Sequence, residues 1–325
     1  MTATPDNPTP DLAAQLPERF IERLRAVIPV ESQGDALASF SAIKPTVFRV
    51  NTLQAAAAKV RDELLALGFT LSPIGGIDVA FSVPHAQRRA LTQTDAVSDG
   101  RIYIQGAASM LAPLVLDPRP GESVLDLCAA PGGKTLMMAA MMGNAGTLNA
   151  VEPGKTRFFK LKANLDRGGA SMVRVYHTDG RQVGRKTPAR FDRILVDAPC
   201  AGEARFNTHD PASYADWSEK KVARCARVQK ALLRSALDAV MPGGVVLYCT
   251  CSMSVEENEG VVKHTLKRMG DAIALEPVRD LPAAVATCPA QAGDGPLVDA
   301  LARCIRVLPA KTHDAFFLAL VRRRV

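Results

Sequence analysis

The segment SVLDLCAAPGGKT, residues 123–135, decides the fold of this chain. Its first six residues form a short apolar run that predicts a buried strand, and its glycines open a turn into a Met- and Ala-rich helix. Further strand-like runs follow at 147–152, 173–178, 191–198 and 243–250, with helical patterns at 153–167, 219–240 and 256–269. Repeated strand–helix units predict an α/β fold with a doubly wound, Rossmann-like parallel sheet. A closing pair of strands is expected at 304–308 and 315–321.

The chain before this sheet has a different pattern. Residues 1–14 are rich in Pro, Thr and Asp, which predicts a disordered tail. Residues 15–100 combine two helical patterns with short strand-like runs and predict a smaller α+β domain. The strand–helix alternation then predicts a second domain over residues 101–325.

Composition narrows the class of partner and the compartment. The 325 residues carry a formal net charge of +7, and the excess of Lys and Arg lies after residue 100. A basic domain favours an anionic partner such as nucleic acid. The seven cysteines are odd in number and lack framework spacing, which indicates free thiols in the cytoplasm. Neither a secretory signal nor a membrane-spanning run is predicted.

The turn after the first strand of the sheet predicts a cofactor site. Glycines there let the backbone approach a ligand, and the following helix offers free N–H groups to a carboxylate. Acidic residues end the next strands, with Glu152 suited to ribose hydroxyls and Asp179 to an adenine edge. Cys128 stands where a nucleoside triphosphate loop needs its first glycine, and the dinucleotide glycine pattern is absent. The remaining candidate is S-adenosylmethionine, held by Cys128, Ala129, Ala130, Pro131, Gly132, Gly133, Lys134, Glu152, Asp179 and Asp197.

Two cysteines are expected to meet over this crevice. Cys200 follows the predicted strand 191–198, and Cys251 follows the strand 243–250. Cys128, Cys249 and Cys304 are interpreted as inert packing residues. No metal site is predicted, because the spacing of Cys249 and Cys251 is too tight for zinc and no histidine cluster lies nearby. A disulfide between the two crevice cysteines is disfavoured in a reducing compartment.

A thiolate at this place predicts covalent catalysis on a pyrimidine. Sulfur addition to C6 of cytosine makes C5 nucleophilic enough to attack a methyl sulfonium, and it divides one hard step into easier ones. The adduct carries charge toward N3, so an acid is needed there, and Asp197 is the candidate if it holds or shares a proton. Release then needs a base for the C5 proton, which a second thiolate or a water could provide. The attacking thiol also needs a lowered pKa.

These stretches together resemble the Nop/Sun family of RNA cytosine-5 methyltransferases, which depend on S-adenosylmethionine. The resemblance runs from about residue 40 to the end of the chain and rests on LDLCAAPGGKT (125–135), DAPC (197–200), TCS (250–252) with EENE (256–259), and FRVNT (48–52). It implies that Cys251 attacks C6 and that Cys200 assists product release. It also implies the listed cofactor contacts and an RNA substrate, with ribosomal RNA favoured over transfer RNA. A catalytically silent RNA-assembly factor is the alternative from another class.

The chain departs from the family pattern at a few positions. Ala201 and Ala204 replace the usual Ser and Gly after the DAPC segment, Cys249 replaces a Ser, and Ala315 replaces a Gly. These changes bear on loop geometry and substrate choice more than on the reaction. By resemblance, residues 44–51 open an RNA-binding N-terminal module, although an ordinary edge strand fits them too. Basic helical patterns at 155–167 and 220–234 are more often solvated faces than RNA contacts. We expect a monomer.

Overall fold

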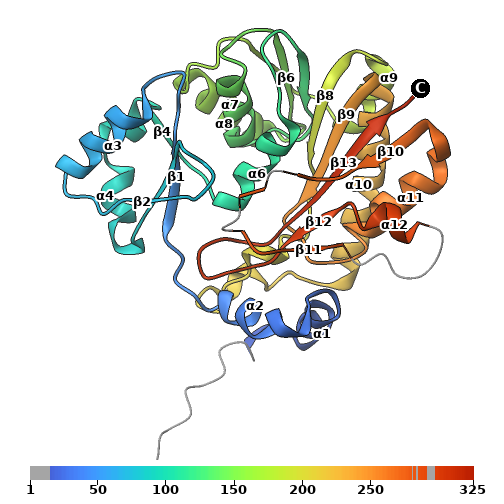
Figure 1. Ribbon diagram of the computed structural model, residues 1–325, viewed down its shortest axis with the longest axis horizontal. Helices are drawn as coiled ribbons and strands as arrows, with labels where there is room; N and C mark the ends of the chain where they lie inside the picture. Colours follow the sequence, from blue (N-terminus) through green and yellow to red (C-terminus); the bar gives the residue numbers. More distant parts are fainter. Residues whose placement is uncertain (1–14, 280, 283–284, 291–296) are drawn as a thin grey trace, which may run out of the picture.

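The computed structural model describes residues 15–279, 281–282, 285–290 and 297–325. The predicted tail, residues 1–14, lies outside these described residues. The described chain folds into a large α/β part built on one mixed sheet and a small four-stranded sheet beside it (Figure 1).

The large sheet has a parallel centre and an antiparallel flank. Its strands run in the order β11-β12-β13-β9-β8-β5-β6-β7, and β10 pairs with β13. The parallel strands are β5 (Ser123–Asp126), β6 (Thr147–Val151), β7 (Val173–Tyr176), β8 (Phe191–Asp197) and β9 (Val240–Thr250). The antiparallel strands are β10 (Ile273–Glu276), β11 (Thr287–Pro289), β12 (Ile305–Val307) and β13 (Phe316–Arg323). The predicted doubly wound sheet is confirmed, and the closing strands make it mixed rather than wholly parallel.

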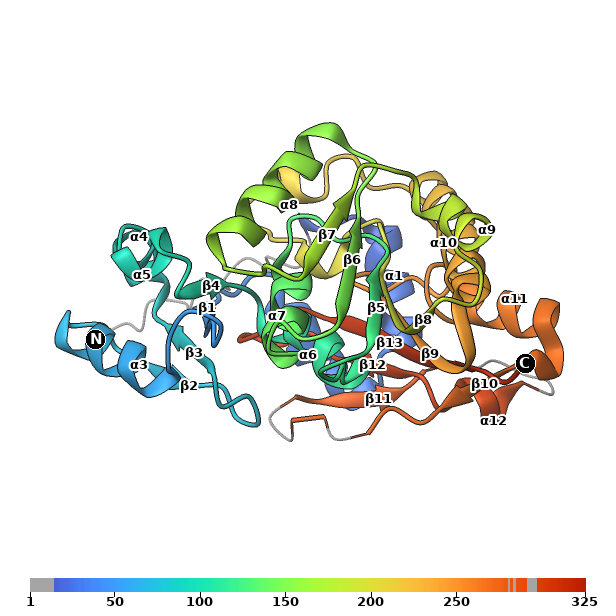
Figure 2. The same cartoon turned by 90° about the horizontal axis from the view of Figure 1, so that it is seen from above.

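Helices cover both faces of the large sheet, because its strands are apolar on both sides. Val124 and its neighbour Leu125 enter different cores, as side chains of adjacent strand residues must. One core is closed by α9 (Val183–Lys186), α10 (Glu219–Ala239) and α11 (Glu259–Met269), and the other by α6 (Ala107–Leu116), α7 (Gly133–Met141) and α8 (Lys155–Arg167). Figure 2 shows these layers from above. The strand order reverses between β5 and β8, which makes this the topological switch point of the sheet. In such sheets a ligand crevice forms beyond the carboxyl ends of the strands at this point.

The small sheet has its own core. It is antiparallel throughout, in the order β2 (Ser72–Pro73), β3 (Ala80–Val83), β1 (Thr46–Val50) and β4 (Ile102–Ile104). Three helices accompany it: α3 (Ala57–Ala66), α4 (Arg88–Thr92) and α5 (Asp95–Ser98). Strand β1 lies inside this sheet, between β3 and β4, and is therefore not the edge strand that the sequence left open.

The structure differs from the predicted 15–100 unit at both of its ends. Helices α1 (Glu18–Val27) and α2 (Gln33–Ser39) pack on the large part, not on the small sheet. Phe20 on α1 lies 4.8 Å from Phe206 and 6.0 Å from Trp217, measured between ring centroids, so the apolar face of α1 is buried there. At the other end, β4 adds residues 102–104 to the small sheet. The small sheet and its helices thus span residues 46–104.

The remaining short elements connect these layers. They are α12 (Val298–Leu301) and the 3-10 turns η2 (Val30–Ser32), η3 (His85–Gln87), η4 (Gly180–Gln182), η5 (Glu203–Arg205), η6 (Pro211–Ser213) and η7 (Gly270–Ala272). Among the described residues, no helix combines the length and the apolar character that crossing a membrane requires.

Candidate active site

The turn between β5 and α7 depends on its two glycines for different reasons. Gly132 has a φ of 111°, a conformation that residues with a side chain rarely adopt. At Gly133 a Cβ atom would lie 2.8 Å from Cε1 of Tyr103, so no side chain fits without a shift. Tyr103 comes from β4, which means that the small sheet closes against this turn.

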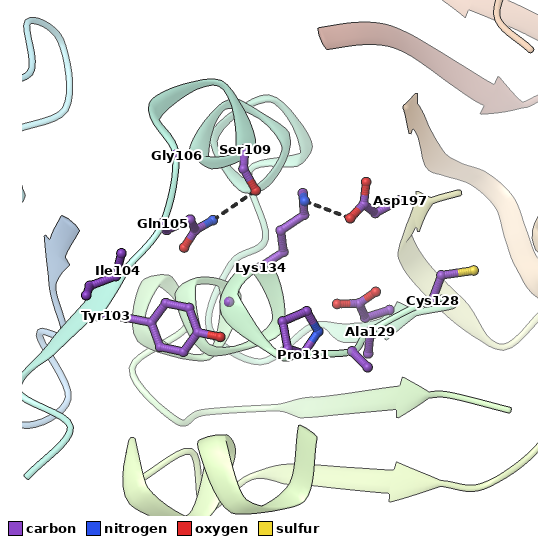
Figure 3. A pocket seen from close by; sticks show the side chains of 13 residues that line it. Tyr103, Ile104, Gln105, Gly106, Ser109, Cys128, Ala129, Pro131, Lys134 and Asp197 are labelled. Atoms are coloured by element: carbon purple, nitrogen blue, oxygen red, sulfur yellow. Dashed lines mark hydrogen bonds and ion pairs between the residues drawn. The ribbon is translucent and has the colours of Figure 1, made fainter. Parts of the chain in front are cut away.

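A cleft of about 910 Å³ opens beyond the parallel strand ends and contains most of the predicted site. The volume is in the usual range for a small-molecule site. Of the predicted residues, it is lined by Cys128, Ala130, Pro131, Lys134, Glu152, Asp179, Asp197, Cys200 and Cys251. An adjoining pocket of about 200 Å³ adds Gly133 and Ala129, and Figure 3 shows Ala129 in its lining. Gly132 lines neither, so its part is to shape the turn.

Glu152 and Asp179, the carboxylates predicted to contact ribose and adenine, both line this cleft, but they have different partners. Glu152 is only 2% exposed and accepts a hydrogen bond from the backbone N of Gly154 at 2.8 Å. Asp179 caps η4 and forms an ion pair with Arg181 at 2.6 Å, and this neighbour lowers the pKa of Asp179. A ligand reaching Asp179 therefore has to share it with Arg181.

Asp197 forms an ion pair with Lys134, whose Nζ lies 2.7 Å from Oδ2 (Figure 3). Burial opposes the charge on Lys134, but the facing Asp197 outweighs it and raises the pKa of the ammonium group. The same Nζ lies 5.5 Å above the ring of Phe316. The ion pair fits an Asp197 carboxylate that shares a proton with Lys134. It does not fit an isolated, protonated Asp197.

The two cysteines predicted to meet are in contact. The Sγ atoms of Cys200 and Cys251 lie 3.1 Å apart at the cleft wall. The hydrogen bond from Cys200 lowers the pKa of Cys251, against burial and with help from the charge of Arg205. The same contact, together with burial, raises the pKa of Cys200 well above its usual value. The contact allows one sulfur to be a thiolate while the other donates to it, and the charge of Arg205 favours Cys251 as the thiolate.

Three of the other cysteines have surroundings that disfavour a thiolate. Burial raises the pKa of Cys128 and Cys249 well above the usual value, although Cys128 borders the cleft. Burial also raises the pKa of Cys304, which is fully buried in a core. Within the described part of the chain, no group of three or more His, Cys, Asp or Glu side chains could hold a metal ion.

Three residues of the site were not predicted from the sequence, and only one of them carries a local signal. Arg205 lines the cleft from η5, and Gln105 lines the small pocket after β4. Asp126 ends β5 in the small pocket, where burial raises its pKa to about 7 against a 2.7 Å hydrogen bond from Thr135. The residue type and strand-end position of Asp126 could have identified it. Arg205 and Gln105 become neighbours of the site only through the tertiary fold.

Arg49 and Asn51 belong to the stretch that was predicted to bind RNA, but their side chains form hydrogen bonds inside the protein. Arg49 is 1% exposed and donates to the carbonyl of Gly133 and to Oε1 of Gln105, both at 3.1 Å. Burial lowers the pKa of Arg49 to about 10. Asn51 is fully buried and donates to the carbonyl oxygens of Gly100 and Gly168. Neither side chain is available to RNA, and both tie the small sheet to the large one.

This fold, with a glycine turn after β5 and an acidic residue after β6, is that of the α/β methyltransferases. The family model for the 16S rRNA methyltransferases RsmB/F matches residues 113–322. The chain belongs to this family, and the predicted Nop/Sun resemblance is confirmed.

Individual relatives agree with this assignment. The chain is 35% identical over 270 residues to the ribosomal RNA small subunit methyltransferase F of Vibrio campbellii, covering 82% of this chain and 56% of that protein. It is 37% identical over 253 residues to the human 28S rRNA (cytosine(4447)-C(5))-methyltransferase, covering 77% of this chain and 31% of that protein. The chain thus spans about half of the first relative and a third of the second.

Solved structures show the same architecture across the chain. The crystal structure of PH0851 aligns with a TM-score of 0.83 at 30% identity, covering 99% of this chain and 70% of that one. A methyltransferase homolog protein from Pyrococcus horikoshii aligns with a TM-score of 0.80 at 28% identity, covering 97% and 99%. The similarity therefore includes the small sheet and α1–α2 as well as the large sheet.

Proposed function

We propose that this protein transfers a methyl group from S-adenosylmethionine to C5 of a cytosine in structured RNA, with ribosomal RNA as the substrate. The observation that carries the proposal is the 3.1 Å contact between Cys251 and Cys200 inside the cleft behind the glycine turn. Methyl transfer to oxygen or nitrogen has no use for two cysteines in contact. The rRNA cytosine-C5 activity in the human relative's name supports the choice of substrate.

The cleft fits the proposed methyl donor. S-adenosylmethionine carries a carboxylate, which suits the free N–H groups at the start of α7, and ribose hydroxyls, which suit buried Glu152. Gly133 lets Tyr103 pack closely against this turn, because a Cβ atom there would lie 2.8 Å from the Tyr103 ring. When bound, the donor supplies an electrophilic methyl group on a sulfonium. Residues 128–134, Glu152, Asp179 and Asp197 are its proposed contacts.

Cys251 is the proposed nucleophile. Its thiolate forms a bond to C6 of the cytosine, and the electron pair of the C5–C6 double bond becomes available for C5 to take the methyl group. A base then removes the proton from C5, and the C–S bond breaks to restore the aromatic ring. Once the Cys251 sulfur is bonded to C6, its negative charge no longer raises the pKa of Cys200, and either a Cys200 thiolate or a water beside it is the proposed base.

Lys134 and Asp197 are proposed to stabilise the charge that moves toward N3 in the adduct. The pair shares one ammonium proton across 2.7 Å at the cleft wall. It can therefore place a donor at N3 without the full cost of an isolated protonated carboxyl group. Asp197 also orients Lys134, which keeps the ammonium group inside the cleft.

RNA is proposed to approach along α8. Its outer side carries exposed basic residues and Phe159, which is 58% exposed, and two of the basic residues also line the cleft. The basic residues are Lys155, Arg157, Lys160, Lys162 and Arg167. An exposed aromatic ring among basic residues suits an unstacked base, and the target cytosine has to leave its stack to reach Cys251. The small sheet and α1–α2 are the proposed RNA-binding extension of this surface.

Labelled S-adenosylmethionine and separate pools of ribosomal and transfer RNA test the proposal. We expect label in ribosomal RNA with the unaltered protein and none with Cys251→Ala, while Cys225→Ala, a change outside the cleft, keeps the activity. Label confined to transfer RNA would move the proposal to that substrate. Ribosomal RNA binding without any methyl transfer would favour the silent assembly factor.

The seven free cysteines suit the predicted cytoplasmic location.

A further inference from the structure

Two buried carboxyl groups lie behind the cysteines, and the proposed reaction does not use them. Glu203 is 1% exposed and Glu257 is fully buried. The hydroxyl of Ser252, the residue after Cys251, lies between them. None of the three borders the cleft, so their effect on the reaction has to pass through the residues that they hold.

Glu203 has the surroundings of an ionised carboxylate. Its Oε1 accepts from the indole N–H of Trp217 at 2.8 Å and from the hydroxyl of Ser254 at 2.6 Å. Its Oε2 accepts from the backbone N–H groups of Met253 and Ser254, at 2.8 and 2.9 Å, and lies 2.8 Å from Oγ of Ser252. Several donors converging on one carboxyl group favour its charged form.

The Ser252 hydroxyl cannot serve both carboxylates. Its Oγ lies 2.8 Å from Oε2 of Glu203 and 2.8 Å from Oε1 of Glu257, yet a hydroxyl has one proton to donate. If both carboxyl groups were ionised, one of these contacts would join two oxygens with no hydrogen between them. One of the two must therefore hold a proton, and Glu203, with its four other donors, is the one that does not need it.

The surroundings of Glu257 agree with a neutral group. Among the residues that the structure describes, no Lys, Arg or His side chain forms an ion pair with it. The groups that face it are the carboxylate of Glu203 on η5, Cys200 after β8, Cys225 and Gln229 on α10, and Tyr248 on β9, whose phenol donates to the backbone carbonyl of Glu257. Burial raises the pKa of Glu257 to about 7.

We propose that Glu257 is held in the folded protein as a neutral carboxylic acid and that this acid positions both cysteine loops. The protonated oxygen donates to Ser252, next to Cys251. The other oxygen accepts from the backbone N of Ala201, next to Cys200, at 3.0 Å, and from Nε2 of Gln229 at 2.7 Å. Glu257 is thus a positioning residue that acts through the two loops.

Thermal unfolding of Glu257→Gln across pH tests the proton directly. The amide reproduces the neutral acid, because its NH2 can donate to Ser252 and its oxygen can accept from Ala201. The wild-type acid keeps a proton that the unfolded chain loses above the usual value of 4.5, so wild-type stability falls as pH rises from 4.5 to about 7. We expect the two melting temperatures to be close near pH 5, and the Gln variant to be several degrees higher at pH 8.

Glu256→Gln is the matched control. The neighbouring Glu256 is half exposed and pairs with Arg23, which lowers its pKa against the effect of burial, so its contribution is constant above pH 5. Its difference from wild type should stay flat between pH 5 and 8. A flat or falling difference for Glu257→Gln would overturn the proposal, because it would mean that the native carboxyl group is already ionised.

The positioning role has a separate readout that rests on the proposed function. In methyl transfer, we expect the wild-type rate to fall above about pH 7 as Glu257 ionises, and the Glu257→Gln rate to keep its value there. Equal alkaline limbs for both proteins would overturn the positioning role. If the wild type transferred no methyl group at all, the proposed function would fail, while the melting experiment would still decide on the proton.

Discussion

The buried ion pair between Glu259 and Arg306 provides a stability test with a calculable size. The guanidinium of Arg306 on β12 donates twice to Glu259 at the start of α11, at 2.7 and 2.5 Å, and the side chains are 2% and 3% exposed, respectively. Arg306 also donates to the carbonyl of Met253 at 2.9 Å, two residues after Cys251. The pair therefore joins the antiparallel flank to the loop that carries the nucleophile.

Glu259→Gln removes the charge and leaves Arg306 buried without its counter-ion. Breaking a buried pair from one side costs about 3–5 kcal/mol. With an unfolding entropy of about 2.1 cal/mol/K per residue, such a loss in a 325-residue chain lowers the melting temperature by roughly 4–7 °C. Thermal unfolding followed by circular dichroism or calorimetry at pH 7 measures it.

The chain offers two controls for this substitution. Glu256→Gln makes the same change three residues earlier in a pair with Arg23 whose carboxylate is 48% exposed, and about 1 kcal/mol or less is expected there. The double change Glu259→Gln with Arg306→Met should recover part of the loss, because no unpaired charge remains. Equal effects of Glu256→Gln and Glu259→Gln, or a double variant less stable than Glu259→Gln alone, would refute the reasoning.

Three further predictions concern the cleft. Gly133→Ala should weaken S-adenosylmethionine binding at least about tenfold in calorimetry, because the new Cβ would lie 2.8 Å from Tyr103 and would shift the turn. Gly34→Ala, with open space around it, should not change the affinity. Equal affinities of the two variants would refute the need for close packing between Gly133 and Tyr103. Cys200→Ala should shift the pH midpoint of Cys251 alkylation upward, because the hydrogen bond that lowers its pKa is lost; an unchanged midpoint would mean that Cys200 does not activate it. Lys134→Met should lower kcat about 10²–10³-fold by removing the charge near N3, and a change in KM alone would assign Lys134 to binding.

The large sheet was predictable because its signals are local. Apolar runs of six to eight residues between turn signals located β5, β6, β7 and β8 within a few residues, and the glycines of the turn marked the start of α7. The meeting of Cys200 and Cys251 was predictable too, because the carboxyl ends of neighbouring parallel strands share one edge of the sheet. The antiparallel flank was only partly visible, since β10 and β11 are three or four residues long.

What the sequence could not show depends on partners far away in the chain. The amphipathic pattern of α1 predicts a helix but not the surface that covers it, and that surface belongs to the large part. Arg49 lies in the stretch that was expected to open an RNA-binding module. Nothing in the local sequence indicates that its hydrogen-bond acceptor is a carbonyl 84 positions later in the chain. The hydrogen bonds that set the protonation of Glu203 and Glu257 come from segments that lie apart in the chain and meet only in the fold, among them Trp217, Gln229 and Ser252.

The bond between Cys251 and C6 of cytosine can be observed directly with RNA that carries 5-fluorocytosine at its cytosines. The last step needs loss of a proton from C5, and fluorine cannot leave in its place, so the adduct should persist through denaturation. After digestion with protease and nuclease, mass spectrometry should find the nucleotide on the peptide containing Cys251, methylated at C5, and Cys251→Ala should give no adduct. A nucleotide attached to Cys200, or methylated RNA with no covalent product at any stage, would contradict the proposed nucleophile.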